Sequence, residues 1–352
     1  MTNMYIGDFH SPFGRARISI AIYAIVVIAT CCAFGYALLA QGHNRLVLSG
    51  ITQLKAQDSD RALLDLNDAV ANLPFDGHAY FCRALAYENK GNHVRALRDL
   101  DTALRYGESK NRVLIAKACV EATASNYAKA ADYCTLSALA QPNNVQSYAV
   151  RAAIHARCHQ YELTTADCDN GLKVCESTKL RARLLRQRGI AQIKVGQGSA
   201  GIADLNGSLS MEPDAGAFLA RANFHRTHND LLAAISDYSK AIKMQPESAN
   251  ACVWRGVCYV GLHEDDAALS DFTHALSINP YSERALIQRG SLYERRSLWQ
   301  LAANDFQDAT KLDPFIKEAQ DRYTIACAHL RSAPSAQPHR QAIASRDGAR
   351  PQ

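Results

Sequence analysis

The feature that most constrains this chain is a repeat of 34 residues. Three stretches in its second half end at Pro246, Pro280 and Pro314, so successive prolines lie 34 residues apart. Before each proline, an alanine, an aromatic residue and a second alanine recur at fixed spacing: Ala234/Tyr238/Ala241, Ala268/Phe272/Ala275 and Ala302/Phe306/Ala309. Such a period is typical of repeat proteins, in which each helical unit buries its apolar face only against its neighbours. The repeat therefore predicts one α-solenoid, although 352 residues would otherwise indicate two or three globular domains.

The spacing of small and large residues resembles the tetratricopeptide repeat (TPR) family. In that family, positions 8, 20 and 27 are small, positions 4, 11 and 24 are large, and position 32 is proline. Small residues let two antiparallel helices approach closely, and proline ends the second helix because it lacks a backbone donor. The resemblance implies an all-α fold of about eight helix-turn-helix repeats over residues 43–316, although the fourth copy lacks the proline. The copies begin near His43, Gly77, Asn111, Val145, Ala182, Ala215, Ala249 and Glu283.

The segment from Ile18 to Ala40 contains no charged side chain. As a helix with a rise of ~1.5 Å per residue, it would be long enough to cross a ~30 Å hydrocarbon core. A cleaved signal peptide is the alternative, but its apolar region is usually only ~7–15 residues long. Cleavage after Ala40 would also place Leu38 where a small residue is preferred. We therefore expect residues 1–17 to form an N-terminal flank and residues 18–40 to form the transmembrane helix of a single-pass membrane protein.

The side of the membrane on which the remaining chain lies is less constrained. Arg15 and Arg17 precede the apolar segment, and Arg45 and Lys55 follow it, so the positive charges are nearly balanced. A long C-terminal domain translocates largely regardless of charge, which favours the extracytoplasmic side. The scattered cysteines beyond the segment, odd in number, suit a reducing compartment instead. We expect the soluble part to be extracytoplasmic, and the cytoplasmic side stays open as the alternative.

The net charge of +5 lies mostly at the C-terminal end of the chain. The body of the protein is therefore nearly neutral, which argues against a nucleic-acid-binding domain. Residues 317–331 are amphipathic and are expected to form a capping helix over the last repeat. Residues 332–352 lack periodicity and large apolar side chains, so a disordered tail is expected.

Charge also follows the repeat, because position 7 is usually basic and position 23 is usually acidic. These residues could form a ladder of cations for an acidic ligand, or they could pair with one another between packed helices. Their similar numbers and common phase favour ion pairs. The basic residues are Arg83, Lys117, Arg151, Arg188, Arg221, Arg255 and Arg289, and the acidic ones are Asp65, Asp99, Asp167, Asp204, Asp237, Asp271 and Asp305.

Two motifs resemble sites that carry chemistry. The string Gly196–Gly201 matches G-x-G-x-x-G, but it lies between two predicted helices, whereas a dinucleotide site needs a strand before the helix. A second group has the side chains of a zinc site, but the repeat places them at opposite helix ends or in the core: His155, Cys158, His159, Cys168 and Cys175. We therefore expect no nucleotide, no metal, no cofactor and no enzymatic activity.

The TPR resemblance implies that positions 2, 5, 9, 12 and 13 of each first helix line a concave surface that binds partner segments. Position 5 is mostly apolar here, so the set of residues with which some family members hold an acidic C-terminal peptide is absent. Trp254, at position 6, is the favoured anchor, and packing between adjacent helices is the alternative role for its ring. The predicted partner-binding residues are Phe81, Leu85, Ile115, Arg186, Ile193, Asn223, Arg226, Trp254, Val257 and Arg295.

Together these features predict a membrane-anchored scaffold that binds protein or peptide segments in a concave TPR groove. The alternative function is an accessory subunit of an envelope secretion or enzyme complex, in which the repeats position a separate catalytic partner.

Overall fold

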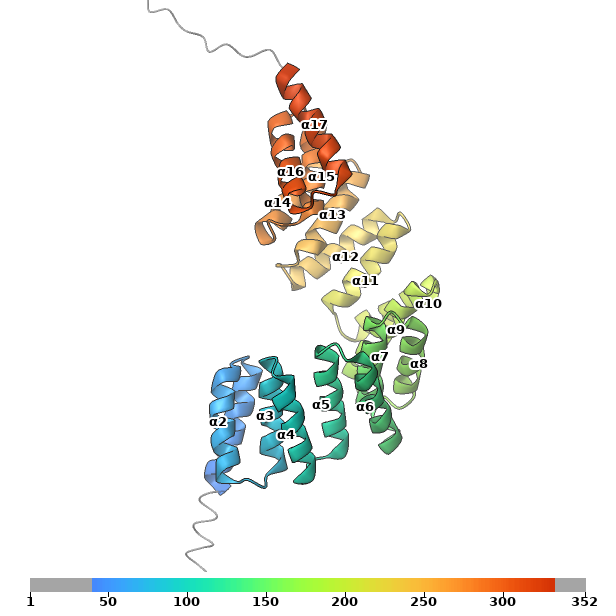
Figure 1. The fold of residues 1–352 in the computed structure, drawn as a ribbon. Helices are drawn as coiled ribbons and strands as arrows, with labels where there is room; N and C mark the ends of the chain where they lie inside the picture. Colours follow the sequence, from blue (N-terminus) through green and yellow to red (C-terminus); the bar gives the residue numbers. More distant parts are fainter. Residues whose placement is uncertain (1–39, 333–352) are drawn as a thin grey trace, which may run out of the picture. The chain divides into compact units, whose positions relative to one another are not determined.

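A computed structural model describes residues 40–332 as helices joined by short turns (Figure 1). No strand occurs in this described part of the chain. The chain divides into two compact units, Met1–Val195 and Gly196–Gln352, which we call unit 1 and unit 2. The division falls within the fifth predicted repeat, so the two helices of that repeat belong to different units.

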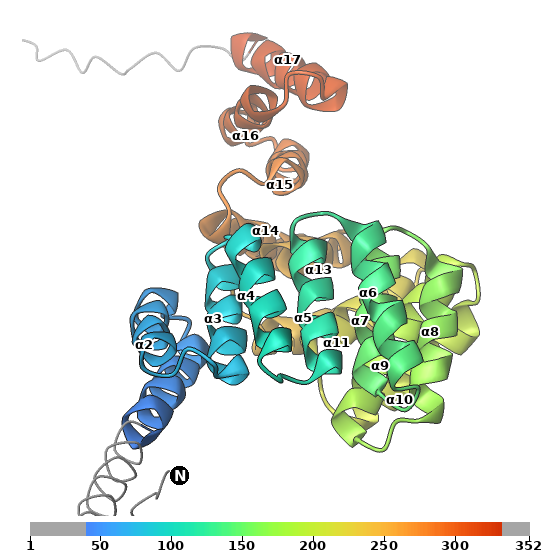
Figure 2. The same ribbon diagram turned by 60° about the horizontal axis from the view of Figure 1, so that its bottom comes forward.

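Unit 1 is a row of helices in which each helix packs against the one before it. Figure 2 shows α3 to α6 side by side in chain order. The first helices of successive repeats, which are α3, α5, α7 and α9, also contact one another along the row. Residues 40–55 are helical and are followed by α2 (Ser59–Asn72), α3 (Gly77–Asn89), α4 (His93–Arg105), α5 (Lys110–Thr123), α6 (Tyr127–Ala140), α7 (Val145–Arg157), α8 (Tyr161–Lys173) and α9 (Thr178–Lys194).

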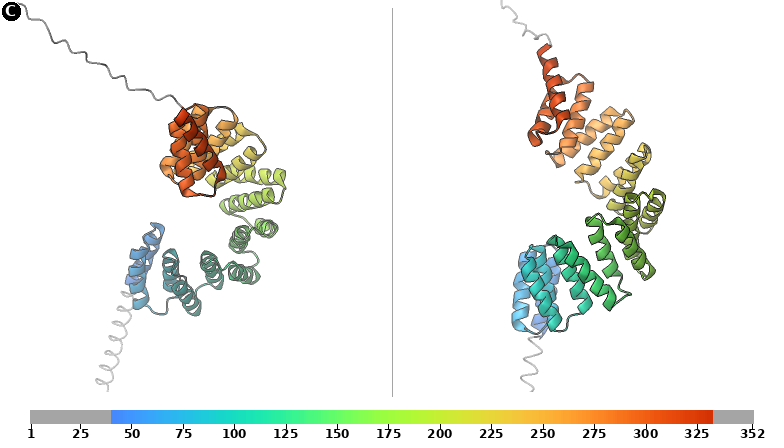
Figure 3. Two further views of the ribbon diagram at one scale, coloured as in Figure 1. Left: turned by 45° about the horizontal axis from the view of Figure 1, so that its top comes forward. Right: turned by 45° about the vertical axis from the view of Figure 1, so that its right-hand side comes forward.

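Unit 2 has the same arrangement, and Figure 3 shows its helices, coloured yellow to red, stacked in chain order. The last helix, α17, begins 34 residues after α15, so it occupies the place of a first helix in a further repeat. The helices are α10 (Gly198–Met211), α11 (Ala215–Thr227), α12 (Leu231–Met244), α13 (Ala249–Gly261), α14 (Asp265–Ile278), α15 (Glu283–Arg295), α16 (Trp299–Leu312) and α17 (Lys317–Ser332). An all-α solenoid of helix pairs, the fold class predicted from the sequence, is therefore present in each unit.

The two helices of a repeat meet where position 8 of the first helix faces position 24 of the second. A Cβ added to Gly256 would lie 2.7 Å from Cε1 of Phe272, and one added to Gly290 would lie 2.8 Å from Cε1 of Phe306. Such distances are too short for real carbon atoms, so a side chain at position 8 would force the phenylalanine ring or its helix to shift. All eight residues at position 24 are at most 1% exposed: Leu66, Leu100, Cys134, Cys168, Leu205, Tyr238, Phe272 and Phe306.

Buried thiols are part of this core, because Cys134 and Cys168 occupy position 24 in repeats three and four. Burial raises the pKa of Cys134 to about 12, and that of Cys82 and Cys258 to about 11. These thiols therefore stay protonated at neutral pH and fill space as small apolar groups. None of the cysteines in the described part of the chain forms a disulfide.

One residue in the turn between the two helices of each repeat has a left-handed backbone. Its φ angle is +71° at Gly91 and +87° at Gly196, and it lies between +56° and +64° at Gln57, Ser125, His159, Asn229, His263 and Ser297. Glycine adopts this conformation at no steric cost. The first glycine of the G-x-G-x-x-G string is therefore explained by the helix reversal before α10.

The position 7 arginines pair with the aspartate sixteen residues later in five repeats. Guanidinium nitrogens donate to the carboxylate at distances of 2.6–3.1 Å in Arg83–Asp99, Arg151–Asp167, Arg221–Asp237, Arg255–Asp271 and Arg289–Asp305. The five aspartate side chains are only 4–8% exposed. The hydrogen bond to Asp271 raises the pKa of Arg255 further above its ordinary value. The predicted ion pairing is therefore confirmed for these five repeats.

Four of these arginines also join their own repeat to the one before it. Nη1 of Arg255 donates to the Ser239 hydroxyl at 3.0 Å, and Ser239 lies on the second helix of the preceding repeat. Arg83, Arg151 and Arg221 make the equivalent bond to Asn67, Thr135 and Asn206. One planar guanidinium thus holds three helices, because its donors point in several fixed directions.

The predicted transmembrane helix at residues 18–40 lies outside the described residues, apart from Ala40. Among residues 40–332, no helix has both the length and the apolar character needed to cross a membrane. Helices α2 to α17 are 13–17 residues long, or ~20–26 Å at ~1.5 Å per residue, and carry polar or charged side chains. On this finding the predicted single-pass membrane localisation is wrong, and it is not carried forward.

Replacing Arg255 by alanine should destabilise unit 2 strongly. Asp271 would be left buried without its cation, a loss that costs about 3 kcal/mol in comparable pairs. Thermal unfolding followed by circular dichroism would measure the change. Arg296→Ala is the control, because Arg296 pairs with the exposed Asp266 and should lose less than ~1 kcal/mol. Equal losses in the two variants would contradict the assigned role of Arg255.

Replacing Gly256 by alanine should lower the stability of unit 2 by about 1–3 kcal/mol, because the new Cβ would overlap Phe272. The double variant Gly256→Ala, Phe272→Leu should recover part of this loss, since the second repeat already has alanine and leucine at these positions in Ala84 and Leu100. Chemical denaturation would measure all three proteins. Gly42→Ala is the control, because an added Cβ there would meet nothing within 4 Å.

Candidate functional site

The ten predicted partner-binding residues are divided equally between the two units. Phe81, Leu85, Ile115, Arg186 and Ile193 belong to unit 1, and Asn223, Arg226, Trp254, Val257 and Arg295 belong to unit 2. The two groups are therefore considered separately.

In unit 1, the predicted residues differ in how much surface they offer to a partner. Phe81 is only 8% exposed and packs in a cluster with Leu100 and Val113. The guanidinium of Arg112 lies 4.5 Å from the centre of its ring. Leu85 is 36% exposed, whereas Ile115, Arg186 and Ile193 are half-buried. Phe81 is thus mainly a core residue, and Leu85 offers the most apolar surface.

In unit 2, Trp254 has a packing role and also contacts a surface pocket. Its half-buried ring packs against a cluster that contains Ala222, Tyr238 and Cys258 from α11, α12 and α13. The alternative of packing between adjacent helices is therefore correct for part of the ring. The guanidinium groups of Arg226 and Arg284 lie 4.1 Å and 4.4 Å from the ring centre, which is within the range of cation–π attraction.

The first pocket, which we call the Trp254 pocket, has a volume of about 420 Å³. It lies along α13, α15 and the start of α17. Its apolar side chains can contact an apolar group of a ligand, and Gln288 offers both a donor and an acceptor. The lining residues are Trp254, Val257, Glu283, Arg284, Ile287, Gln288, Ile316 and Glu318.

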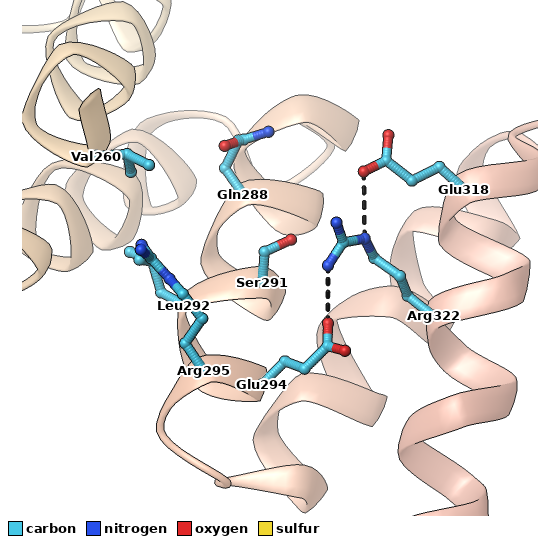
Figure 4. Close-up of a pocket in the computed structure, with 8 residues that line it drawn as sticks. All are labelled: Val260, Gln288, Ser291, Leu292, Glu294, Arg295, Glu318 and Arg322. Carbon is cyan, nitrogen blue, oxygen red and sulfur yellow. Dashed lines mark hydrogen bonds and ion pairs between the residues drawn. The ribbon is translucent and has the colours of Figure 1, made fainter. Parts of the chain in front are cut away.

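The second pocket, which we call the Arg322 pocket, has a volume of about 570 Å³ and shares Gln288 and Glu318 with the first. Figure 4 shows Arg322 on α17 between two carboxylates. Its Nη1 donates to Glu294 at 2.8 Å, and its Nε donates to Glu318 at 3.2 Å. The remaining lining residues are Val260, Ser291, Leu292 and Arg295. The two pockets are adjacent, and we call the surface that they form over α13, α15 and α17 the α13–α15–α17 groove.

The other predicted residues of unit 2 differ in their relation to this groove, because only Arg295 among Arg295, Asn223 and Arg226 lines it. Arg295 lines the Arg322 pocket and donates to Asp265 at 2.8 Å. Asn223 accepts a hydrogen bond of 2.7 Å from the Tyr238 hydroxyl, to which Arg226 is also hydrogen-bonded. Burial raises the pKa of Tyr238 to about 12, although its bond to Arg226 opposes the shift, so the hydroxyl is protonated at neutral pH. Asn223 is thus engaged with α12, whereas Arg226 reaches Trp254.

Sequence reasoning did not identify several residues of the groove. Arg284 and Ser291 occupy positions 2 and 9, which the family pattern assigns to the concave surface, so the pattern could have found them. Glu318 and Arg322 lie on α17, which was expected only to cap the last repeat. The spacing of the helices could have identified these two residues. Helix α17 begins at Lys317, which lies 34 residues after Glu283, the first residue of α15. Helix α17 therefore stands where the first helix of a ninth repeat would begin. This position predicts that residues of α17 extend the surface formed by the first helices of the preceding repeats.

The group that resembled a zinc site is accounted for by helix packing in unit 1. Nδ1 of His155 lies 2.9 Å from Oδ2 of Asp167, beside the Arg151 pair. His159 occupies the left-handed turn position and contacts the Tyr161 hydroxyl at 2.8 Å. Cys168 and Cys175 are buried.

Comparison with known proteins identifies the repeat. Residues 48–101 and 219–283 match the family model of the tetratricopeptide repeat. The sequence matches no curated protein.

Three solved structures are similar in fold. One is the APC/C hetero-tetramer Cut9–Hcn1. The match covers 80% of this chain and 55% of the Cut9–Hcn1 chain, with 13% sequence identity and a TM-score of 0.57. Another is yeast Tom70. The match covers 83% of this chain and 66% of the Tom70 chain, with 16% sequence identity and a TM-score of 0.54. The third is a tetratricopeptide repeat protein from Parabacteroides merdae. The match covers 71% of this chain and 98% of that protein's chain, with 15% sequence identity and a TM-score of 0.51.

This chain thus spans about half of the matched Cut9–Hcn1 chain and about two thirds of Tom70. At these identities the likeness concerns the fold alone. The family match in both units, the 34-residue period and the fold of these structures together support the tetratricopeptide repeat family for this chain.

Proposed function

We propose that unit 2 binds a segment of a partner protein in the α13–α15–α17 groove. The observation that carries this proposal is that the Trp254 and Arg322 pockets lie side by side and share Gln288 and Glu318 as lining residues. Two adjacent pockets fit a peptide segment better than a compact small molecule, because a segment can contact both pockets at once. Surface grooves that combine apolar and polar side chains are common sites of recognition.

The lining of the groove has the composition that a peptide segment requires. Val257, Ile287 and Ile316 line the Trp254 pocket and can bury an apolar side chain of the partner. Full burial of one such side chain contributes roughly 1.5–3 kcal/mol. Gln288 can hydrogen-bond the partner's backbone, and Trp254 supplies a large rigid surface of the kind found at binding hot spots.

The fold supports the same proposal, since TPR-type helical repeats typically serve as non-catalytic scaffolds for protein interactions. One of the similar structures is itself a hetero-tetramer of two proteins, Cut9 and Hcn1. The alternative function, an accessory subunit that positions a catalytic partner, would use the groove in the same way and differs only in the partner's activity. A second contact surface in unit 1 remains a prediction. Its residues are Phe81, Leu85, Ile115, Arg186 and Ile193.

Site-specific photo-crosslinking would test the proposal. Gln288 is replaced by p-benzoylphenylalanine, and the protein is irradiated in an extract of its source organism. We expect a defined partner to be crosslinked, because the probe lies between the two pockets. The Trp254→Ala change in the same protein should abolish this product. Part of the ring packs in the core, so the variant is expected to be less stable, and circular dichroism establishes that it is still folded at the temperature of the experiment.

The matched control carries the same probe at Gln300, an exposed glutamine of α16 that lines neither pocket. An identical set of crosslinked proteins from positions 288 and 300 would contradict binding in the groove. Persistence of the product after Trp254→Ala would remove Trp254 from the site.

A further inference from the structure

We infer that the Trp254 end of the α13–α15–α17 groove selects a partner segment with an acidic side chain next to its apolar anchor. This inference rests on the proposed function and specifies the chemistry of the segment. It comes from two arginines that are held differently from the other arginines near the groove.

Arg226 and Arg284 approach the same indole from the helices on either side of α13. Arg226 lies on α11 and Arg284 on α15, with ring-centre distances of 4.1 Å and 4.4 Å to Trp254. Stacking uses the flat face of a guanidinium and leaves its N–H groups, which lie in the plane, available for hydrogen bonds. Trp254 therefore fixes two cations in position without neutralising them.

Other arginines near the groove are already paired with carboxylates. Arg295 donates to Asp265, and Arg322 donates to both Glu294 and Glu318. Arg289, like Arg255, pairs with a buried aspartate of its own repeat. In contrast, neither Arg226 nor Arg284 forms an ion pair with any carboxylate in the described part of the chain.

Arg226 also has a donor that is not satisfied. Its Nε is buried and has no hydrogen-bond partner among the described residues, while its guanidinium reaches the Tyr238 hydroxyl. A buried donor without a partner costs free energy, so the guanidinium of Arg226 is not fully satisfied within the fold. Arg284 is exposed at the other side of the ring and can reach the same ligand from solvent.

The arginines at the two ends of the groove differ in their ion pairing. Two carboxylates of the Trp254 pocket are Glu283 and Glu318, and Glu318 is already engaged with Arg322. Arg284 lines this pocket and has no ion pair within residues 40–332, and Arg226 lines neither pocket but reaches the same Trp254 ring. At the other end, Glu294 and Glu318 share one guanidinium. An acidic residue of the partner is thus attracted to the Trp254 end, which would also fix the direction of the segment.

Selection from a peptide library would test the inference. The probe is a library of random twelve-residue peptides displayed at the amino end of a phage coat protein, where no peptide has a free C-terminal carboxylate. We expect peptides selected on the full chain to be enriched in aspartate or glutamate beside an aromatic or aliphatic residue. Binding of a selected peptide should weaken ~tenfold in the double variant Arg226→Gln, Arg284→Gln, since two partly exposed ion pairs are lost.

The charge-reversed variant Arg226→Glu, Arg284→Glu should select lysine or arginine at the same place. Arg296→Gln is the matched control, because this arginine pairs with Asp266 and lines neither pocket. Thermal unfolding of each variant establishes that it is folded.

The outcomes separate the two proposals. Peptides that compete for the groove but show no acidic enrichment, or that bind the double glutamine variant unchanged, would overturn the inference and leave the proposed function in place. Failure to select any peptide that depends on Trp254 would overturn both.

Discussion

The structure depends on a single contact that is made once in every repeat, between position 8 of the first helix and position 24 of the second. A buried side chain at position 24 fits only if position 8 is small, because the two helix backbones approach closely there. Gly256 and Gly290 face phenylalanines, whereas Ala84 faces the smaller Leu100. The position 7 arginines add the second requirement, since each holds its own helix pair together and several also bind the preceding repeat.

These two contacts explain residues that could otherwise be mistaken for functional ones. The cations at position 7 look like a binding surface in the sequence, but their aspartate partners are buried and face them directly. Cys134 and Cys168 occupy position 24 and fill the core. Gly196 starts a nucleotide-like string, yet it occupies the left-handed turn position that every repeat contains. In each case the repeat gives the reason for the residue, and candidates for function must be sought among the side chains that the repeat does not use.

Trp254 and its two arginines are such side chains. They occupy positions 12, 6 and 2 of three successive repeats and take no part in the arginine–aspartate pairs, and only part of the Trp254 ring packs against the core. Their place on consecutive first helices also follows from the repeat, because those helices lie next to one another in the row. The regular scaffold thus brings together residues that are about thirty positions apart in sequence, and variation at these positions can change the ligand without changing the fold.

The sequence by itself determined the all-α repeat fold, the phase of each repeat from Gly77 onward and the pairing of five arginines with aspartates. It could do so because these features recur at a fixed spacing, and a recurring spacing specifies which residues meet. Only the tertiary structure decided which predicted groove residues are accessible. It placed Phe81 in the core, engaged Asn223 with Tyr238 and brought Glu318 and Arg322 of α17 into the groove. These outcomes depend on side-chain directions and on non-repeated contacts between neighbouring helices, which a periodic pattern does not contain.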